Sequence, residues 1–218
     1  MRKVVPAVLA CVVLTGCGGT VSGTATWPGT RLDAALLTEP DFPAGVRYDR
    51  IVERPGEPDG AGGPGSMLSR PQGCANALTD VIAESAERGP GSAAKYAASY
   101  DGARIVMTLL SSNLDLAKLR AEATRCAAFE AFFDPDSEGI PITTTPLPGV
   151  DGDGIAYQQT MTLRDAASSV YMAFANVGDS AVFGVAFGTP DRSIGAKAIM
   201  PRTFLDVFSQ QVRKLRAS

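Results

Sequence analysis

The chain has 218 residues, with 20 lysines and arginines against 23 aspartates and glutamates, so its net charge at neutral pH is −3. This acidic balance argues against nucleic acid as a partner. The sequence contains no histidine, which excludes serine and cysteine hydrolases that use imidazole as the base, and zinc sites built on histidine.

The N-terminus has the pattern of a bacterial lipoprotein signal peptide. Two basic residues precede an apolar run from Val4 to Leu14, which is shorter than the roughly 20 residues that span a bilayer. The next residues, Leu14-Thr15-Gly16-Cys17, resemble the lipobox of bacterial lipoproteins. By that resemblance residues 1–16 are a cleaved signal peptide, and Cys17 carries a thioether-linked diacylglyceryl group. The alternative is a soluble secreted protein in which this cysteine has no such role.

Lipidation at Cys17 predicts a protein held on the extracytoplasmic face of the cell membrane. A second acyl chain such as palmitate makes the anchoring durable, because one chain binds a bilayer only marginally. Removal of Arg2 and Lys3 with the signal peptide changes the net charge from −3 to −5. Residues 17–30 are small and polar, and they are interpreted as a flexible tether between the lipid and a single domain over residues 31–218.

The first half of this domain alternates short elements with a long glycine- and proline-rich stretch. A short helix is predicted at Leu32–Leu37 and a first strand at Val46–Glu53. The following stretch, Arg54–Gly73, contains too much Gly and Pro for a regular element. Loops of this length are usually functional lids or mobile insertions, and we favour the mobile insertion. Cys74–Glu87 has the spacing of an amphipathic helix.

The second half is dominated by strand patterns. Asp101-Gly102 is typical of a tight hairpin turn between two strand-like runs. A helix is predicted from Leu114 to about Phe133, with Asn113 as a candidate N-cap and Cys126 in its middle. Four more strands and a C-terminal helix follow, at Ile140–Leu147, Ile155–Leu163, Ser169–Val177, Ala181–Phe187 and Ser193–Leu215. Short loops make the last three strands antiparallel neighbours.

These elements predict an α+β fold. We expect an antiparallel β-sheet of about six to seven strands, packed with a disulfide-tied helix pair and a C-terminal helix. Of the four cysteines, Cys11 leaves with the signal peptide and Cys17 is acylated, so Cys74 and Cys126 remain. An even pair in an oxidising compartment most simply forms one disulfide. Two separate buried thiols are the alternative, and a redox-active pair is less favoured because the two are not in a Cys-x-x-Cys turn.

Three short motifs resemble catalytic or metal-binding signatures but lack their partners. Ser92–Lys95 matches the Ser-x-x-Lys motif of penicillin-recognising enzymes, yet neither Ser-Asp-Asn nor Lys-Thr-Gly occurs in the chain. Gly178–Ala181 resembles a lipolytic Gly-Asp-Ser signature but sits in a hairpin turn. Asp151–Gly154 lacks the further oxygen ligands that a calcium loop needs. No catalytic residue, metal ligand or cofactor is therefore assigned.

Four tyrosines on predicted strands have two interpretations. Rings of this kind usually pack at the edge of a core, and they also line binding grooves. The residues concerned are Tyr96, Tyr100, Tyr157 and Tyr171.

The order of elements resembles a known family. The Pro-x-x-Cys helix start at Pro71–Cys74, a later helix carrying Arg125–Phe129 ("RCAAF"), three closing strands and a C-terminal helix are similar to the extracellular sensor domain of the mycobacterial serine/threonine kinase PknH. The resemblance covers about Leu32–Leu215. It implies a disulfide-braced sheet, a cleft proposed to bind a ligand, and no known enzymatic activity. This chain departs from the kinase sensor in having one disulfide instead of two, and no transmembrane helix or kinase domain.

The predicted function is that of a membrane-anchored, non-catalytic domain that binds a small molecule or envelope component in a cleft. The alternative is an interaction module that docks on another envelope protein through the Gly/Pro loop. The ligand-binding residues are not identified by the sequence. The assigned sites are Cys17 for lipidation and the pair Cys74 and Cys126 for the disulfide.

Overall fold

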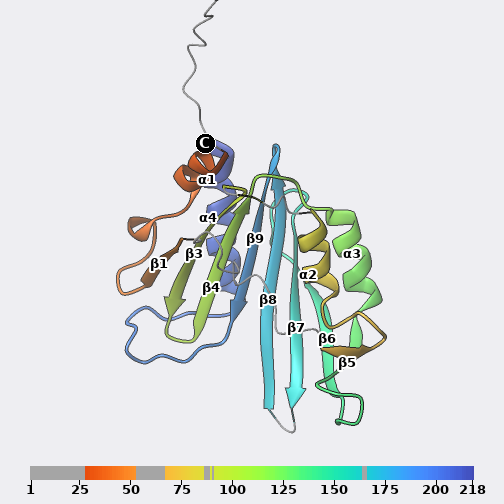
Figure 1. The fold of residues 1–218 in the computed structure, drawn as a ribbon. Helices are drawn as coiled ribbons and strands as arrows, with labels where there is room; N and C mark the ends of the chain where they lie inside the picture. Colours follow the sequence, from red (N-terminus) through yellow and green to blue (C-terminus); the bar gives the residue numbers. More distant parts are fainter. Residues whose placement is uncertain (1–27, 53–66, 86–88, 90, 164–165) are drawn as a thin grey trace, which may run out of the picture.

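The computed structural model describes residues 28–52, 67–85, 89, 91–163 and 166–218. In these residues nine strands form one antiparallel sheet, in the order β1-β3-β4-β9-β8-β7-β6-β5-β2, and four α-helices pack against it (Figure 1). The strands are β1 (Arg47–Ile51), β2 (Leu68–Arg70), β3 (Ala93–Tyr100), β4 (Ala103–Leu110), β5 (Ala128–Phe132), β6 (Ile140–Leu147), β7 (Ile155–Leu163), β8 (Ala166–Val177) and β9 (Ser180–Phe187). The helices are α1 (Pro28–Ala35), α2 (Ala77–Ser85), α3 (Leu116–Arg125) and α4 (Arg202–Ala217), with a short 3-10 helix, η1 (Glu39–Asp41). No helix in these ranges is long and apolar enough to cross a membrane.

The predicted α+β fold with six to seven strands is wrong, because the described chain is mostly β and its single sheet has nine strands. The two additional strands lie where the sequence indicates other structure. β2 lies inside the Gly/Pro-rich stretch 54–73, and β5 lies inside the predicted helix 114–133. Residues 54–66 of that stretch lie outside the described residues.

The helix predicted to reach Phe133 ends much earlier. α3 stops at Arg125, and Cys126 is its C-cap and not a mid-helix residue. From Ala128 onward burial alternates, with Phe129 and Ala131 inside the protein. Such a two-residue repeat is typical of a strand with one buried face. Pairing of β5 with β6 on one side and β2 on the other therefore prevails over the helical propensity of the alanines.

The C-terminal helix also begins later than predicted, at Arg202 instead of Ser193. The preceding residues, 188–201, form an irregular segment that we call the 188–201 segment. The backbone N–H of Asp101, in the β3–β4 turn, donates to the Ala196 carbonyl at 2.8 Å. The segment is therefore held by bonds to a distant turn instead of by helical bonds of its own.

The predicted hairpins are confirmed. β3 and β4 are joined at Asp101-Gly102, where Tyr100 pairs with Ala103 and Gly102 has a φ of 101°. β7, β8 and β9 are consecutive antiparallel neighbours. Their short connections leave no other arrangement.

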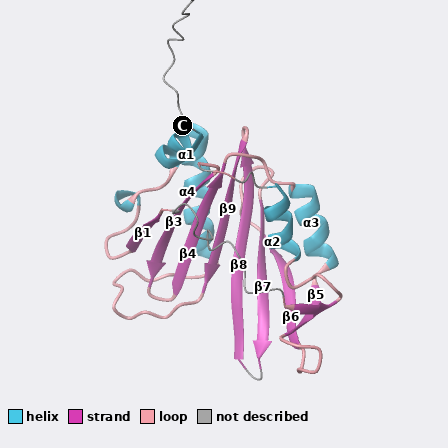
Figure 2. Cartoon of the chain, in the orientation of Figure 1, coloured by secondary structure: helices cyan, strands magenta, loops and turns pink. Residues whose placement is uncertain are grey.

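The four helices cover opposite faces of the sheet in two pairs. On β8, Ala173 and Ala175 pack in the cluster that contains α1 and α4, whereas Met172 and Phe174 pack in the cluster that contains α2 and α3. Successive side chains of a strand point to opposite faces, so the two pairs lie on opposite sides. Figure 2 shows them over opposite halves of the sheet.

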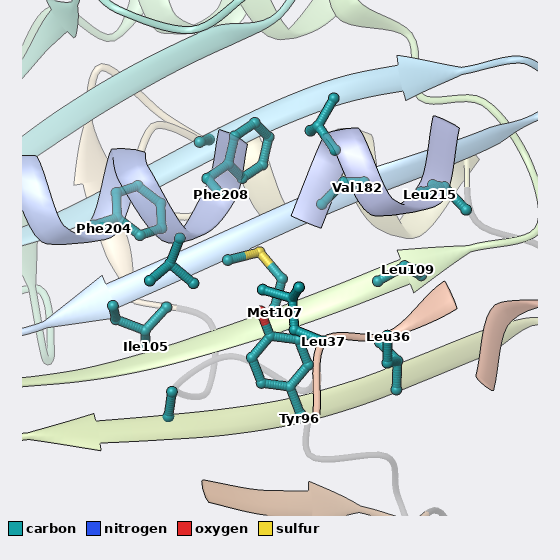
Figure 3. Close-up of a cluster of buried hydrophobic side chains, with 14 of the residues drawn as sticks. Leu36, Leu37, Tyr96, Ile105, Met107, Leu109, Val182, Phe204, Phe208 and Leu215 are labelled. Carbon is teal, nitrogen blue, oxygen red and sulfur yellow. The ribbon is translucent and has the colours of Figure 1, made fainter. Parts of the chain in front are cut away.

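The core under α4 is built from large apolar side chains of β3, β4, β9 and the helix (Figure 3). Phe204 and Phe208 of α4 are fully buried against it. A Cβ at Gly184 of β9 would lie only 2.9 Å from the Met107 sulfur and 3.0 Å from the Phe204 ring. Glycine at this position therefore allows α4 to approach the sheet closely.

Candidate functional site

A surface pocket of about 310 Å³ lies between the η1–β1 connection and the 188–201 segment. It is formed where the first described strand meets the segment that precedes α4. Its lining residues are Glu39, Gly45, Val46, Arg47, Tyr48, Ser193 and Ile194.

The wall that precedes β1 is shaped by local capping. Asp41 accepts hydrogen bonds from the backbone N–H of Thr38 at 2.7 Å and from its hydroxyl at 2.9 Å, which closes the η1 turn. Gly45 has a φ of 90°, in the left-handed region that favours glycine. A Cβ there would lie 3.1 Å from the Ala196 nitrogen, and the Ala196 N–H donates to the Gly45 carbonyl at 3.3 Å. Gly45 therefore allows the two walls of the pocket to contact each other.

The opposite wall is held by charge and hydrogen bonds around Asp191. Its carboxyl group accepts from the backbone N–H of Ser193 at 3.0 Å and from the Ser193 hydroxyl at 2.5 Å. Arg47 lies 3.6 Å from the same carboxylate and donates to the Ser193 hydroxyl at 3.4 Å. The Ser193 hydroxyl bond, the backbone bond and then Arg47 lower the pKa of Asp191. The carboxylate is thus charged at neutral pH and orients this wall.

The side chain of Tyr48, the aromatic residue of the pocket, is held by contacts with residues outside the lining. The Tyr48 hydroxyl donates to the Leu37 carbonyl at 2.9 Å, and its ring stacks on Tyr96 with centroids 5.5 Å apart. Burial raises the pKa of Tyr48, so it stays protonated at neutral pH. The hydrogen bond and the ring contact together fix the position of the Tyr48 side chain.

The lining of the pocket carries charged, polar and aromatic groups. It combines an acidic residue, Glu39, with a basic residue, Arg47, beside a hydroxyl and an aromatic ring. Ligand sites typically use a few such polar groups to set the orientation of the ligand.

The predicted disulfide is confirmed. Cys74 and Cys126 are bonded, with their Cα atoms 5.4 Å apart, and both are at most 2% exposed. They connect the start of the α2 region to the end of α3, and pack with Phe129 and Ala131 of β5 in a small core. Cys17, the predicted lipidation site, lies outside the described residues.

The motifs that resemble catalytic signatures occupy structural positions. Lys95 lies within β3. Ser180 is 1% exposed, and its hydroxyl accepts from Arg31 of α1 at 2.6 Å. Both residues therefore belong to the framework of the sheet.

The sequence did not identify the residues of this pocket. Of the four tyrosines considered for a groove, Tyr96, Tyr100 and Tyr157 are buried and Tyr171 is half-buried, and none lines the pocket. The residues that do line it come from two segments about 150 positions apart, at 39–48 and 193–194. The one available signal was Gly45, a glycine just before a predicted strand.

Comparisons with known proteins leave the family open. No family model matches the chain, and no curated protein matches it. One similar solved structure is the X-ray structure of an uncharacterised protein (Rv0999 ortholog) from Mycobacterium smegmatis, with 13% sequence identity and a TM-score of 0.48. The similarity covers 81% of this chain and 92% of the mycobacterial one. At this level it assigns neither a fold family nor a function.

Proposed function

We propose that this chain is a lipoprotein of the cell envelope, anchored through Cys17 to the extracytoplasmic face of the membrane. Its folded part is a non-catalytic domain, similar to the PknH extracellular domain, that binds a small polar molecule or envelope component. The lipobox-like residues 14–17 support the anchor. The disulfide between Cys74 and Cys126 supports an oxidising compartment, where such bonds form and persist.

The observation that carries the binding function is the pocket between η1–β1 and the 188–201 segment. Glu39 and Arg47 line it together, and Asp191 already balances the charge of Arg47, so a polar ligand with a cationic group and a neutral hydrogen-bond acceptor matches it best. Its walls are preorganised, because Gly45 and Asp191 are held by the hydrogen bonds described above. Preorganised walls bind with a smaller loss of conformational entropy than mobile ones.

Native mass spectrometry of the mature protein purified from its own envelope tests this function. Additional mass that is retained under gentle conditions and lost on denaturation identifies a ligand. Arg47→Gln is expected to abolish that mass, whereas Arg192→Gln, which removes the same charge from an exposed neighbouring position outside the lining, is expected to retain it. A protein that is always empty, or a ligand that survives Arg47→Gln, contradicts the proposal.

A second function, docking on another envelope protein, is favoured by the outer edge of the sheet. β2 is the last strand in the sheet order. Leu68 in β2 is 48% exposed, and Phe133, directly after β5, is 75% exposed. Strand edges with exposed apolar side chains are common sites for pairing with another chain. The Gly/Pro loop named as the contact by the sequence lies outside the described residues up to residue 66.

Crosslinking in the native envelope separates the two functions. If the edge docks on a protein, Phe133→Ser removes a specific crosslinked species, and Leu163→Ser, at a 57% exposed leucine at the end of β7, does not. If both variants give the wild-type pattern, docking through this edge is refuted.

A further inference from the structure

The start of α1 and the end of α4 lie together at one end of the molecule. Figure 1 shows α1 beside the C-terminus, at the end of the molecule where the β8–β9 turn lies. The two helices also contact each other, since Gln211 of α4 bonds to the last turn of α1. Pro28, the first described residue, is in α1. The segment that would connect the domain to a lipid therefore joins it at this end.

Three arginines are found on these two helices at this end. Arg213 and Arg216 are exposed and three positions apart, so they share one face of the last turns of α4. Neither has an ion-pair partner among the described residues. Arg31 of α1 is also exposed, and donates to the neutral hydroxyl of Ser180. None of the three forms an ion pair with a carboxylate in the described chain.

The acidic groups of the same segments are largely neutralised. Asp33 pairs with Arg50. Asp41 lies 2.8 Å from Lys214, with both side chains about two-thirds buried. The exposed Glu39 of η1 and Asp179 of the β8–β9 turn remain without an ion pair in the part of the chain that the structure describes, so three guanidinium groups stand against two acidic side chains of these segments.

The opposite end of α4 is different. There Arg202 lies 3.9 Å from Asp206, so its charge is balanced on the helix surface. A chain with a net charge of −3 thus places unbalanced positive charge at the end from which its N-terminal segment departs. Such an asymmetry orients a molecule in the field of a charged surface.

The length of the N-terminal segment keeps this end near a bilayer. Cys17 precedes Pro28 by 11 residues, none of the residues between them charged. A fully extended segment of this length spans at most about 40 Å, and a flexible one spans about 20 Å on average. Electrostatic attraction acts over a Debye length of about 8 Å at physiological salt, which lies well within this reach.

We propose that the basic end formed by Arg31, Arg213 and Arg216 contacts anionic phospholipid headgroups and orients the domain on the membrane. The inference rests on the proposed lipid anchor at Cys17. In this orientation the pocket near β1 and the 188–201 segment, toward the other end of α4, is directed away from the bilayer.

The test uses the mature lipidated protein reconstituted on vesicles of phosphatidylcholine alone or of phosphatidylcholine with phosphatidylglycerol. A fluorophore is placed at Ala217→Cys, at the end of α4, or at Thr189→Cys, beyond the end of β9, and energy transfer to a headgroup dye is measured. We expect stronger transfer from position 217 than from 189 on the phosphatidylglycerol vesicles. The difference should fall in about 1 M salt, where the Debye length is about 3 Å, to the smaller difference that the tether alone produces on phosphatidylcholine vesicles.

Charge variants show whether these arginines are responsible. A basic residue near an anionic surface contributes about fivefold to binding, so Arg213→Gln/Arg216→Gln should lower the equilibrium constant for the oriented state about 25-fold. The matched control, Arg192→Gln/Arg202→Gln, removes two charges from the far end and should leave it unchanged. Equal transfer from both labels, or an unchanged preference in the Arg213→Gln/Arg216→Gln variant, overturns the proposal.

Failure of the anchor gives a different result. An unlipidated protein does not associate with phosphatidylcholine vesicles at all, and its mass lacks the diacylglyceryl group. Its direct binding to phosphatidylglycerol vesicles still reports on the basic end. Loss of that binding in Arg213→Gln/Arg216→Gln supports the surface, and its persistence refutes it.

Discussion

Gln211 is a buried polar residue whose replacement should destabilise the fold. It lies in α4 and is fully buried. Its side-chain oxygen accepts from the Leu37 N–H at 2.9 Å, and its side-chain nitrogen donates to the Ala35 carbonyl at 2.8 Å. The last carbonyls of a helix have no partner within that helix. The Gln211 side chain therefore supplies hydrogen-bond partners for backbone groups at the end of α1, although it lies more than 170 residues away in the sequence.

Gln211→Met keeps the approximate size of the side chain and removes both bonds. The two backbone groups are then left unsatisfied in an environment where Ala35 and Leu37 are at most 1% exposed. Each buried group without a partner costs about 1–3 kcal/mol, and the more apolar methionine offsets part of this cost. We expect a loss of about 2–4 kcal/mol in the free energy of unfolding, which corresponds to a fall of about 5–15 °C in Tm.

Urea unfolding of the wild-type protein and two variants measures this loss. The matched control is Gln210→Met, at the preceding position, because that side chain is half-buried and makes one bond of 3.2 Å to the Asp41 carbonyl. The control is expected to lose less than about 1.5 kcal/mol. If Gln211→Met loses no more free energy of unfolding than Gln210→Met, the backbone groups at the end of α1 find other hydrogen-bond partners and the prediction is refuted.

Three further predictions concern the core, the disulfide and pH. Tyr96 is fully buried and its hydroxyl has no hydrogen-bond partner in the described chain, so Tyr96→Phe should be neutral or stabilising by up to about 2 kcal/mol in urea unfolding; a marked loss of stability contradicts this. The disulfide closes a loop with a sequence separation of 52, so the Cys74→Ala/Cys126→Ala variant should lose about 4 kcal/mol, and a loss below about 1 kcal/mol in thermal unfolding would falsify its stabilising role. The bond to Lys214 is the largest of the causes that lower the pKa of Asp41 from its unfolded value of 3.8. The ionised carboxylate therefore stabilises the fold above pH 3.8. This stabilisation is lost as the pH falls through the lower pKa of the folded state. Asp41→Asn should therefore be less stable than wild type at pH 7, and the difference should shrink below pH 3.8; a constant difference across that range excludes the ion pair as its cause.

The strands of the central sheet are the part of the fold that local sequence predicts well. β7, β8 and β9 are separated by short turns, and their alternating side chains are visible without knowledge of the partners. β5 and β2 are different. Ala128–Phe132 follows a true helix in a sequence rich in alanine, and its strand character depends on pairing with β6 and β2. A pairing of this kind leaves only a weak local pattern, so the sequence indicated a longer helix.

The pocket shows the same limit for function. Arg47 and Ser193 are unremarkable in the sequence, because each is a polar residue at the surface. They become neighbours because the 188–201 segment bonds to Asp101 and to Gly45. Such backbone contacts between distant segments do not depend on side-chain identity. No sequence motif therefore predicts them.

By itself, then, the sequence determined the absence of histidine chemistry, the cysteine pair and the main β-hairpins, since these follow from composition, number and local periodicity. The tertiary structure decided the nine-stranded order, the helix pairs on opposite faces, the end of α3, and the meeting of Glu39 and Arg47 with the 188–201 segment. The physical reason is that these features arise from hydrogen bonds and packing between residues far apart in the chain. Their stability is realised only when the whole sheet has formed.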